Sequence, residues 1–173
     1  MSEEAHLPVT DTHGNVMVSL AAVAENDVRT DGPVPCPLAL VVAASPDGVL
    51  FGMNRWRRQW ELLGGIIEPG ESPRQAAARE FTEESGMPVE LAELTFTGVA
   101  TFELVNPTRR ELAAVFSARF DEAFAPQENE ELTAFLWSDD SRPHSDMSTI
   151  DHAIARWVRA GTPSSSPING LAE

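Results

Sequence analysis

The chain has 173 residues, 42% of them hydrophobic, and its 12 basic and 27 acidic residues give a formal net charge of −15. This length suits one domain with a core of its own, the composition is too apolar for a disordered chain, and the aliphatic runs are too short to cross a bilayer. The acidic balance disfavours a nucleic-acid polymer or an anionic membrane as partner, and because every basic residue is arginine, lysine-dependent chemistry is excluded.

Residues 1–35 are predicted to form an N-terminal extension. The first ten residues lack the apolar segment of a signal peptide, which predicts a cytoplasmic location, and the lone thiol of Cys36 agrees with it. Val16–Ala24 is apolar and predicts an accessory strand that covers a sheet edge, or that pairs with a second copy in a homodimer. Asp27–Pro37, with a glycine and three prolines, predicts a linker or an ordered loop.

The main domain is predicted over residues 36–160, as an α+β fold with a mixed β-sheet flanked by helices. Two apolar runs, Leu38–Ala44 and Val49–Met53, flank a Ser-Pro-Asp-Gly turn and predict a β-hairpin. Further strands are predicted at Leu94–Glu103, Leu112–Phe120 and Leu132–Trp137.

A helix near the end of the chain is predicted at Met147–Arg159, where Ile150, Ile154 and Val158 recur at helical spacing. The Ser- and Pro-rich residues 161–173 are predicted to form a flexible tail.

The helix predicted at Pro73–Ser85 has complete boundary signals. Ser72 is a good N-cap, proline occupies the first helical position, and Gln75 completes a capping box. Gly86 follows the helix and can adopt the left-handed conformation that ends it.

Three glutamates of this helix, at spacing i, i+3 and i+4, project from one side of it: Glu80, Glu83 and Glu84. A solvated acidic face is the plain interpretation. The preceding loop, Leu63–Glu71, favours a second one, because its three glycines and one proline can bring the backbone close to a bound ion or phosphate.

Residues Gly65–Met87 resemble the complete Nudix box: Gly65, five residues, Glu71, seven residues, Arg-Glu-Phe, one residue, Glu-Glu, one residue, Gly-Met. The resemblance implies a Nudix-type α/β/α sandwich and a hydrolase. Nudix hydrolases cleave a nucleoside diphosphate linked to another moiety, by attack of water at phosphorus, with Mg²⁺ or Mn²⁺ as cofactor. The implied substrate is a small nucleotide, a nucleotide sugar or a nucleoside triphosphate.

The resemblance also implies roles for individual residues. Arg79 is expected to pair with Glu71 and hold it in place, with an ordinary i,i+4 pair to Glu83 as the alternative. The implied metal ligands are the carbonyl of Gly64 and the carboxylates of Glu80, Glu83 and Glu84.

Two features outside the helix bear on the same chemistry. Several family members use a later glutamate as ligand or general base, and Glu131, six residues before Trp137, matches it better than Glu130. Leu63 stands where the family commonly has proline, which leaves the position of the Gly64 carbonyl open.

A basic cluster with interleaved tryptophans is the candidate for substrate binding, through Arg55, Arg58 and Trp60. Arginine binds phosphate through paired hydrogen bonds and tryptophan stacks on a base. If this segment is a strand, alternate residues from Trp56 to Trp60 share one face. A surface turn whose tryptophans cover the core is the equal alternative.

Two other functions stay open. A Nudix-fold sensor would bind a nucleotide without cleaving it, although such a module has no need for three clustered acids. An isoprenoid diphosphate isomerase on the same scaffold is disfavoured, because its reaction typically involves a cysteine in a setting different from that of Cys36.

Overall fold

The computed structural model describes residues 6–139 and 143–161. The described part contains the helices α1 (Pro73–Ser85) and α2 (Thr149–Gly161) and the 3₁₀ turns η1 (Glu25–Asp27) and η2 (Leu91–Glu93). Its strands are β1 (Val9–Thr10), β2 (Val16–Ala21), β3 (Leu38–Ser45), β4 (Gly48–Asn54), β5 (Trp60–Glu61), β6 (Leu63–Ile66), β7 (Thr95–Val105), β8 (Thr108–Arg119) and β9 (Leu132–Ser138).

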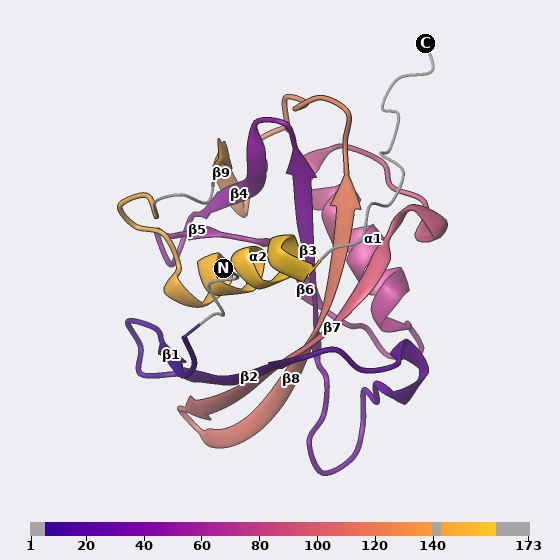
Figure 1. The fold of residues 1–173 in the computed structure, drawn as a ribbon, viewed down its shortest axis with the longest axis vertical. Helices are drawn as coiled ribbons and strands as arrows, with labels where there is room; N and C mark the ends of the chain where they lie inside the picture. The colour runs from indigo at the N-terminus through magenta and orange to yellow at the C-terminus, as the bar shows by residue number, and fades with distance from the viewer. Residues whose placement is uncertain (1–5, 140–142, 162–173) are drawn as a thin grey trace.

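All these strands belong to one mixed sheet (Figure 1). Its order is β1-β2-β7-β8-β3-β4-β5, and β6 and β9 pair with β3 and β4 respectively. β3 and β8 run parallel, with Leu38 opposite Ala113, whereas the other strand pairs are antiparallel. The predicted mixed sheet is therefore confirmed.

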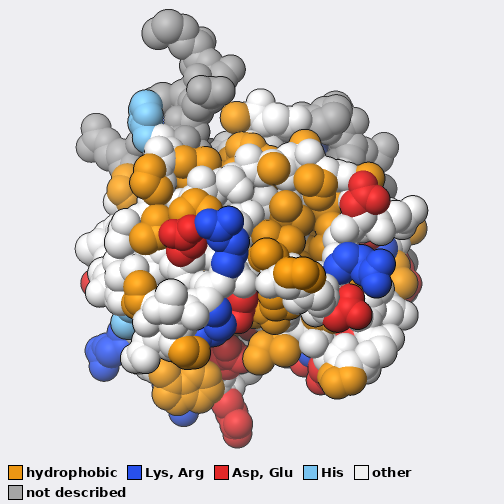
Figure 2. Space-filling model, turned by 90° about the horizontal axis from the view of Figure 1, so that it is seen from below, with side chains coloured by type: hydrophobic (Ala, Val, Ile, Leu, Met, Phe, Trp, Pro, Cys, Tyr) orange, Lys and Arg blue, Asp and Glu red, His pale blue; other side chains and the backbone are white. Residues whose placement is uncertain are grey.

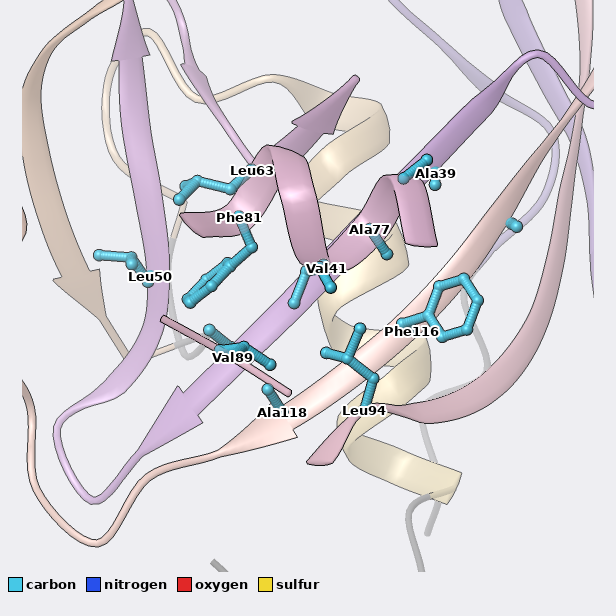
Figure 3. Close-up of a cluster of buried hydrophobic side chains, with 14 of the residues drawn as sticks. Ala39, Val41, Leu50, Leu63, Ala77, Phe81, Val89, Leu94, Phe116 and Ala118 are labelled. Carbon is cyan, nitrogen blue, oxygen red and sulfur yellow. The ribbon is translucent and has the colours of Figure 1, made fainter. Parts of the chain in front are cut away.

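The two helices cover opposite faces of the sheet, because side chains alternate along the central strands. In β3, Val41 packs in a core with Phe81 of α1, whereas Val42 packs in a second core with Ile154 of α2. Figure 3 shows the Phe81 ring between Leu50 and Val41. Two cores around one sheet confirm the predicted α+β sandwich.

The predicted elements lie where expected, with shifted ends. The hairpin is β3 and β4, and the three later strands are β7, β8 and β9. β8 begins at Thr108, four residues before the prediction, because β7 and β8 continue to a tight turn at Asn106 and Pro107. α2 begins at Thr149, since the Ser148 hydroxyl accepts a hydrogen bond from the Asp151 amide and caps the helix.

Residues 55–57 form a turn and not a strand, and Arg58 has a φ of 54°. The alternation expected for a strand from Trp56 to Trp60 therefore does not apply. The segment is a surface turn in which Trp60 packs against the core whereas Trp56 is 67% exposed. Only Trp60 and Glu61 are extended, as β5.

The β1–β2 hairpin lies at one edge of the sheet, where β2 pairs antiparallel with β7. β2 takes up residues 16–21 of the predicted 16–24. The homodimer through this edge stays a prediction. Apart from Gly161, which ends α2, the predicted tail of residues 161–173 lies outside the described residues.

Figure 2 shows the face seen from below Figure 1, where acidic and basic side chains flank an apolar band. Among the described residues, neither helix has the length and apolar character needed to cross a bilayer.

At Gly98, β2 lies so close to β7 that there is no room for a side chain. Its φ is +154°, and a Cβ atom there would lie 2.2 Å from the Ala21 carbonyl oxygen. We expect Gly98→Ala to lower the free energy of unfolding by at least about 2 kcal/mol, because β2 must shift. Urea unfolding measures this. Gly161→Ala, with nothing within 4 Å of the added methyl, is the control; equal losses in both variants would contradict the close approach.

Candidate active site

α1 is held in register at both ends. The Ser72 hydroxyl accepts a hydrogen bond from the Gln75 amide at 3.1 Å, and the Gln75 side chain accepts one from the Ser72 amide at 2.8 Å. Gly86, at φ 75°, ends the helix in the left-handed conformation. Both predicted boundary signals are confirmed, and with Phe81 anchored in the core they fix the direction in which the glutamates of α1 project.

Glu84 is the most deeply buried of these glutamates, with 6% of its surface exposed. Its carboxylate accepts a hydrogen bond from the Gly64 amide at 2.9 Å, which fastens α1 to β6. Burial raises the pKa of Glu84 to about 9, and the negative charges of Glu131 and Glu80 act in the same direction. A proton or a cation is therefore needed to neutralise this carboxylate.

Glu80 lies against the second glycine of the loop. A Cβ atom on Gly65 would come within 2.6 Å of the Glu80 carboxyl carbon, so this close approach requires glycine. Burial raises the pKa of Glu80 above its usual value, although the guanidinium of Arg79, 2.8 Å away, opposes the shift.

Arg79 connects the loop to the acidic side of α1. Its guanidinium donates to the two carboxylate oxygens of Glu71 at 2.8 and 2.9 Å and to the carbonyl of Ile66 at 3.0 Å. The hydrogen bonds from Arg79 hold the pKa of Glu71 below its usual value. The alternative pair with Glu83 is also present, at 3.5 Å.

Glu83 differs from its two neighbours, because 61% of its side chain is exposed. In residues 6–139 and 143–161, no three acidic, histidine or cysteine side chains already surround one point as metal ligands would. The donors at this site are nonetheless all hard oxygens, and they carry more negative charge than Arg79 alone offsets. That donor set fits Mg²⁺ or Mn²⁺.

Glu131 reaches the site through a loop that docks on the end of α1. The Asn129 side chain donates to the Glu84 carbonyl at 2.7 Å, and its oxygen accepts from the amides of Glu131 and Leu132 at 2.9 Å. Asn129 is thus a positioning residue that sequence reasoning missed. Its signal is local: an asparagine two residues before a candidate base at the start of a strand.

A cleft of about 440 Å³ opens beside this site, on the α2 side of the sheet. Its lining includes Gly64 and Gly65, which lie in β6 and not in the predicted loop, together with Glu131, residues of α2 and residues of the β1–β2 loop. Its apolar floor comprises Leu38, Leu40, Leu62, Phe102, Leu104 and Ile150.

The basic cluster of Arg55, Arg57 and Arg58 meets this cleft through the arginine that is not among the three predicted substrate-binding residues. Arg57 lines the cleft and pairs with Glu61 through two hydrogen bonds of 2.5 and 2.7 Å. Arg55, Arg58 and Trp60 are not among its lining residues. Trp60 instead pairs with Met53 in the sheet, so its assignment to substrate, like that of the two arginines, stays a prediction.

Asp151 is a second cleft residue that sequence reasoning missed. Its carboxylate, in the first turn of α2, accepts a hydrogen bond at 2.7 Å from the amide of Leu62, the residue between β5 and β6. Burial and the nearby charge of Glu61 raise the pKa of Asp151 to about 7. In the sequence it appears as an acid in the first turn of a helix, which the helix dipole alone explains.

Cys36 lies in the core under α1 with none of its surface exposed, and burial raises the pKa of its thiol to about 11. It does not border the cleft. This placement gives the isomerase interpretation no reactive thiol.

Comparison with known proteins places this site in a family. The family model of the NUDIX domain matches residues 36–156. The chain is 34% identical over 113 residues to an oxidized purine nucleoside triphosphate hydrolase of Danio rerio, which covers 64% of this chain and 70% of the relative. It is 36% identical over 96 residues to an octanoyltransferase of Myxococcus xanthus, which covers 52% of this chain but only 27% of that protein.

Among solved structures, the pyrophosphohydrolase BsRppH of Bacillus subtilis superposes with a TM-score of 0.64. The match has 17% identity and covers 89% of this chain and 97% of that one. At this identity the likeness shows a shared fold, and it extends over more of the chain than residues 36–156.

The buried carboxyl of Asp151 makes stability depend on pH. Its pKa is raised from 3.8 to about 7, so its contribution to stability is complete below pH 3.8 and is lost as the pH rises through about 7. We expect Asp151→Asn, which does not titrate, to gain about 3 kcal/mol relative to the wild type across that range. Urea unfolding at a series of pH values measures it. The exposed Asp121→Asn is the control, and a pH-independent difference for Asp151→Asn would refute the burial effect.

Proposed function

The chain belongs to the NUDIX domain family, and we propose that it is a Mg²⁺-dependent pyrophosphohydrolase. It cleaves a nucleoside diphosphate linked to another moiety by attack of water at phosphorus. The observation that carries the proposal is the buried carboxylate of Glu84, which accepts a hydrogen bond from Gly64 and lies near further negative charge. Gly64 and Glu131 in turn line the cleft.

The proposed metal ligands are Glu80, Glu84 and the carbonyl of Gly64, with Glu83 joining from the exposed side of α1. The repulsion among these carboxylates is what a divalent cation removes. When bound, such an ion supplies charge neutralisation between phosphates and lowers the pKa of a water molecule.

The protein groups then have separate tasks. Arg79 is a positioning residue, since its hydrogen bonds to Glu71 and Glu80 hold both carboxylates without reaching the cleft. Glu131 borders the cleft beside the glycine loop and is the proposed acceptor of the proton from the attacking water. Its position depends on the Asn129 hydrogen bonds.

The apolar floor of the cleft and Asp151 suit a nucleoside. A base can lie on the apolar floor, and Asp151, with a pKa of about 7, can present a protonated carboxyl oxygen as well as an acceptor to the edge of the base. The hydrolase of Danio rerio is named for purine nucleoside triphosphates, so we propose these as the substrate class.

Glu84→Gln tests the proposal. We expect kcat to fall by about 1,000-fold or more, because the variant loses the charge that holds the cation while it keeps the size of the side chain. The measurement is product release from a panel of nucleoside triphosphates, ADP-ribose and sugar nucleotides in Mg²⁺, with chelator added as a second arm. Glu122→Gln, on an exposed loop, is the matched control and should retain full activity.

Unchanged activity in Glu84→Gln would overturn the metal assignment. Tight nucleotide binding by the wild type without any phosphate product would support the sensor function instead.

A further inference from the structure

One wall of the cleft comes from outside residues 36–156. The loop between β1 and β2 contributes Asp11, His13 and Asn15 to the lining, so a segment of the N-terminal extension meets the cleft that holds Asp151 and the glycine loop. Figure 1 shows β1 and β2 as the outermost strands on the side of the sheet that α2 covers.

The loop has a fixed conformation of its own. The Asp11 carboxylate accepts hydrogen bonds from the amides of His13 and Asn15 at 2.8 and 2.9 Å and from the Asn15 side chain at 2.9 Å. Burial works against ionisation of Asp11, but these hydrogen bonds outweigh it and lower its pKa. Gly14, at φ +86°, makes the turn. Because this loop is already ordered, a ligand that enters the cleft loses no binding free energy to ordering it.

Hydrogen bonds also join the hairpin to the sheet and to α2. On the sheet side, the Asn15 side-chain oxygen accepts from the Val105 amide at 3.2 Å. On the helix side, the Thr149 hydroxyl at the start of α2 donates to the Thr10 carbonyl at 3.0 Å. The wall therefore keeps its position relative to Asp151, which lies in the same helical turn as Thr149.

A third contact joins the hairpin to the β4–β5 turn. The Gln59 side chain donates to the Thr12 hydroxyl at 3.2 Å, across 47 residues of sequence. Gln59 itself lines the cleft, so this hydrogen bond links two of its walls. These hydrogen bonds join the hairpin to Val105, Thr149 and Gln59, whereas the proposed phosphate site lies at Glu84 and the glycines of β6. We therefore assign the hairpin to the nucleoside and not to the phosphates.

We propose that the β1–β2 hairpin is the wall of the cleft that selects the nucleoside, and that the Gln59–Thr12 hydrogen bond holds this wall in position. The inference rests on the proposed function for its ligand class, a purine nucleoside carrying a phosphate chain. The hairpin acts by shape and position and takes no part in the attack on phosphorus.

The test uses the full chain with two probes, guanosine 5′-monophosphate and inorganic tripolyphosphate, titrated calorimetrically in Mg²⁺. Thr12→Val keeps the shape of the side chain and removes the hydrogen-bond acceptor, and we expect it to weaken nucleotide binding about 3- to 10-fold. Asp11→Ala releases the loop, and we expect about 10-fold weakening or more. Neither should change tripolyphosphate binding. Thr30→Val, exposed in the loop between η1 and β3, is the matched control for both probes.

Wild-type affinity for the nucleotide in both variants overturns the inference, and so does an equal loss for both probes. If the Asp11→Ala variant does not fold, the binding measurements on Thr12→Val alone decide whether the inference holds. Hydrolysis of GTP is measured separately: we expect a higher KM and an unchanged kcat in Thr12→Val. A wild type that binds the monophosphate but releases no product overturns the proposed function and leaves the hairpin inference standing.

Discussion

The arrangement of the site depends on one buried carboxylate. Glu84 joins α1 to β6 through the amide of Gly64, a residue that lines the cleft, so this contact holds the acidic side of α1 against the strand that borders the cleft. Removing a carboxylate from water is unfavourable unless charge compensates it. The fold supplies the Gly64 amide and places further acids nearby, so under the proposed function the charge that compensates Glu84 comes from a bound cation.

The parts that sequence could predict are those fixed by neighbours along the chain. α1 begins and ends where its caps require, and the Arg79–Glu71 pair spans only eight residues. Asp151 and the hairpin loop could not be found in this way. Asp151 reaches the cleft because the start of α2 lies against Leu62, and the hairpin loop reaches it because β2 pairs with β7. No local sequence pattern indicates either contact.

In the basic cluster, the sequence indicates the chemistry but not which residue reaches the cleft. Its composition indicates phosphate binding, but the turn at residues 55–57 directs Arg57 toward Glu61 and the cleft, and a strand would have presented its neighbours instead. A left-handed Arg58 is not foreseeable from residue type, because non-glycine residues rarely adopt that conformation. Backbone conformation, and not charge pattern, decided which arginine lines the cleft.

The negative charge of the residues that line the cleft explains why the proposed function needs both a cation and a rigid wall. Asp11, Glu61, Glu111, Glu131 and Asp151 all border it, and Arg57, the one arginine among the described lining residues, is already paired with Glu61. A bare triphosphate is repelled by such a surface, whereas a triphosphate neutralised by Mg²⁺ is not. Attraction at the phosphate end then depends on the metal, and discrimination between substrates is left to the nucleoside end. There the apolar floor, the Asp151 carboxyl and the hairpin define shape and hydrogen bonding independently of charge.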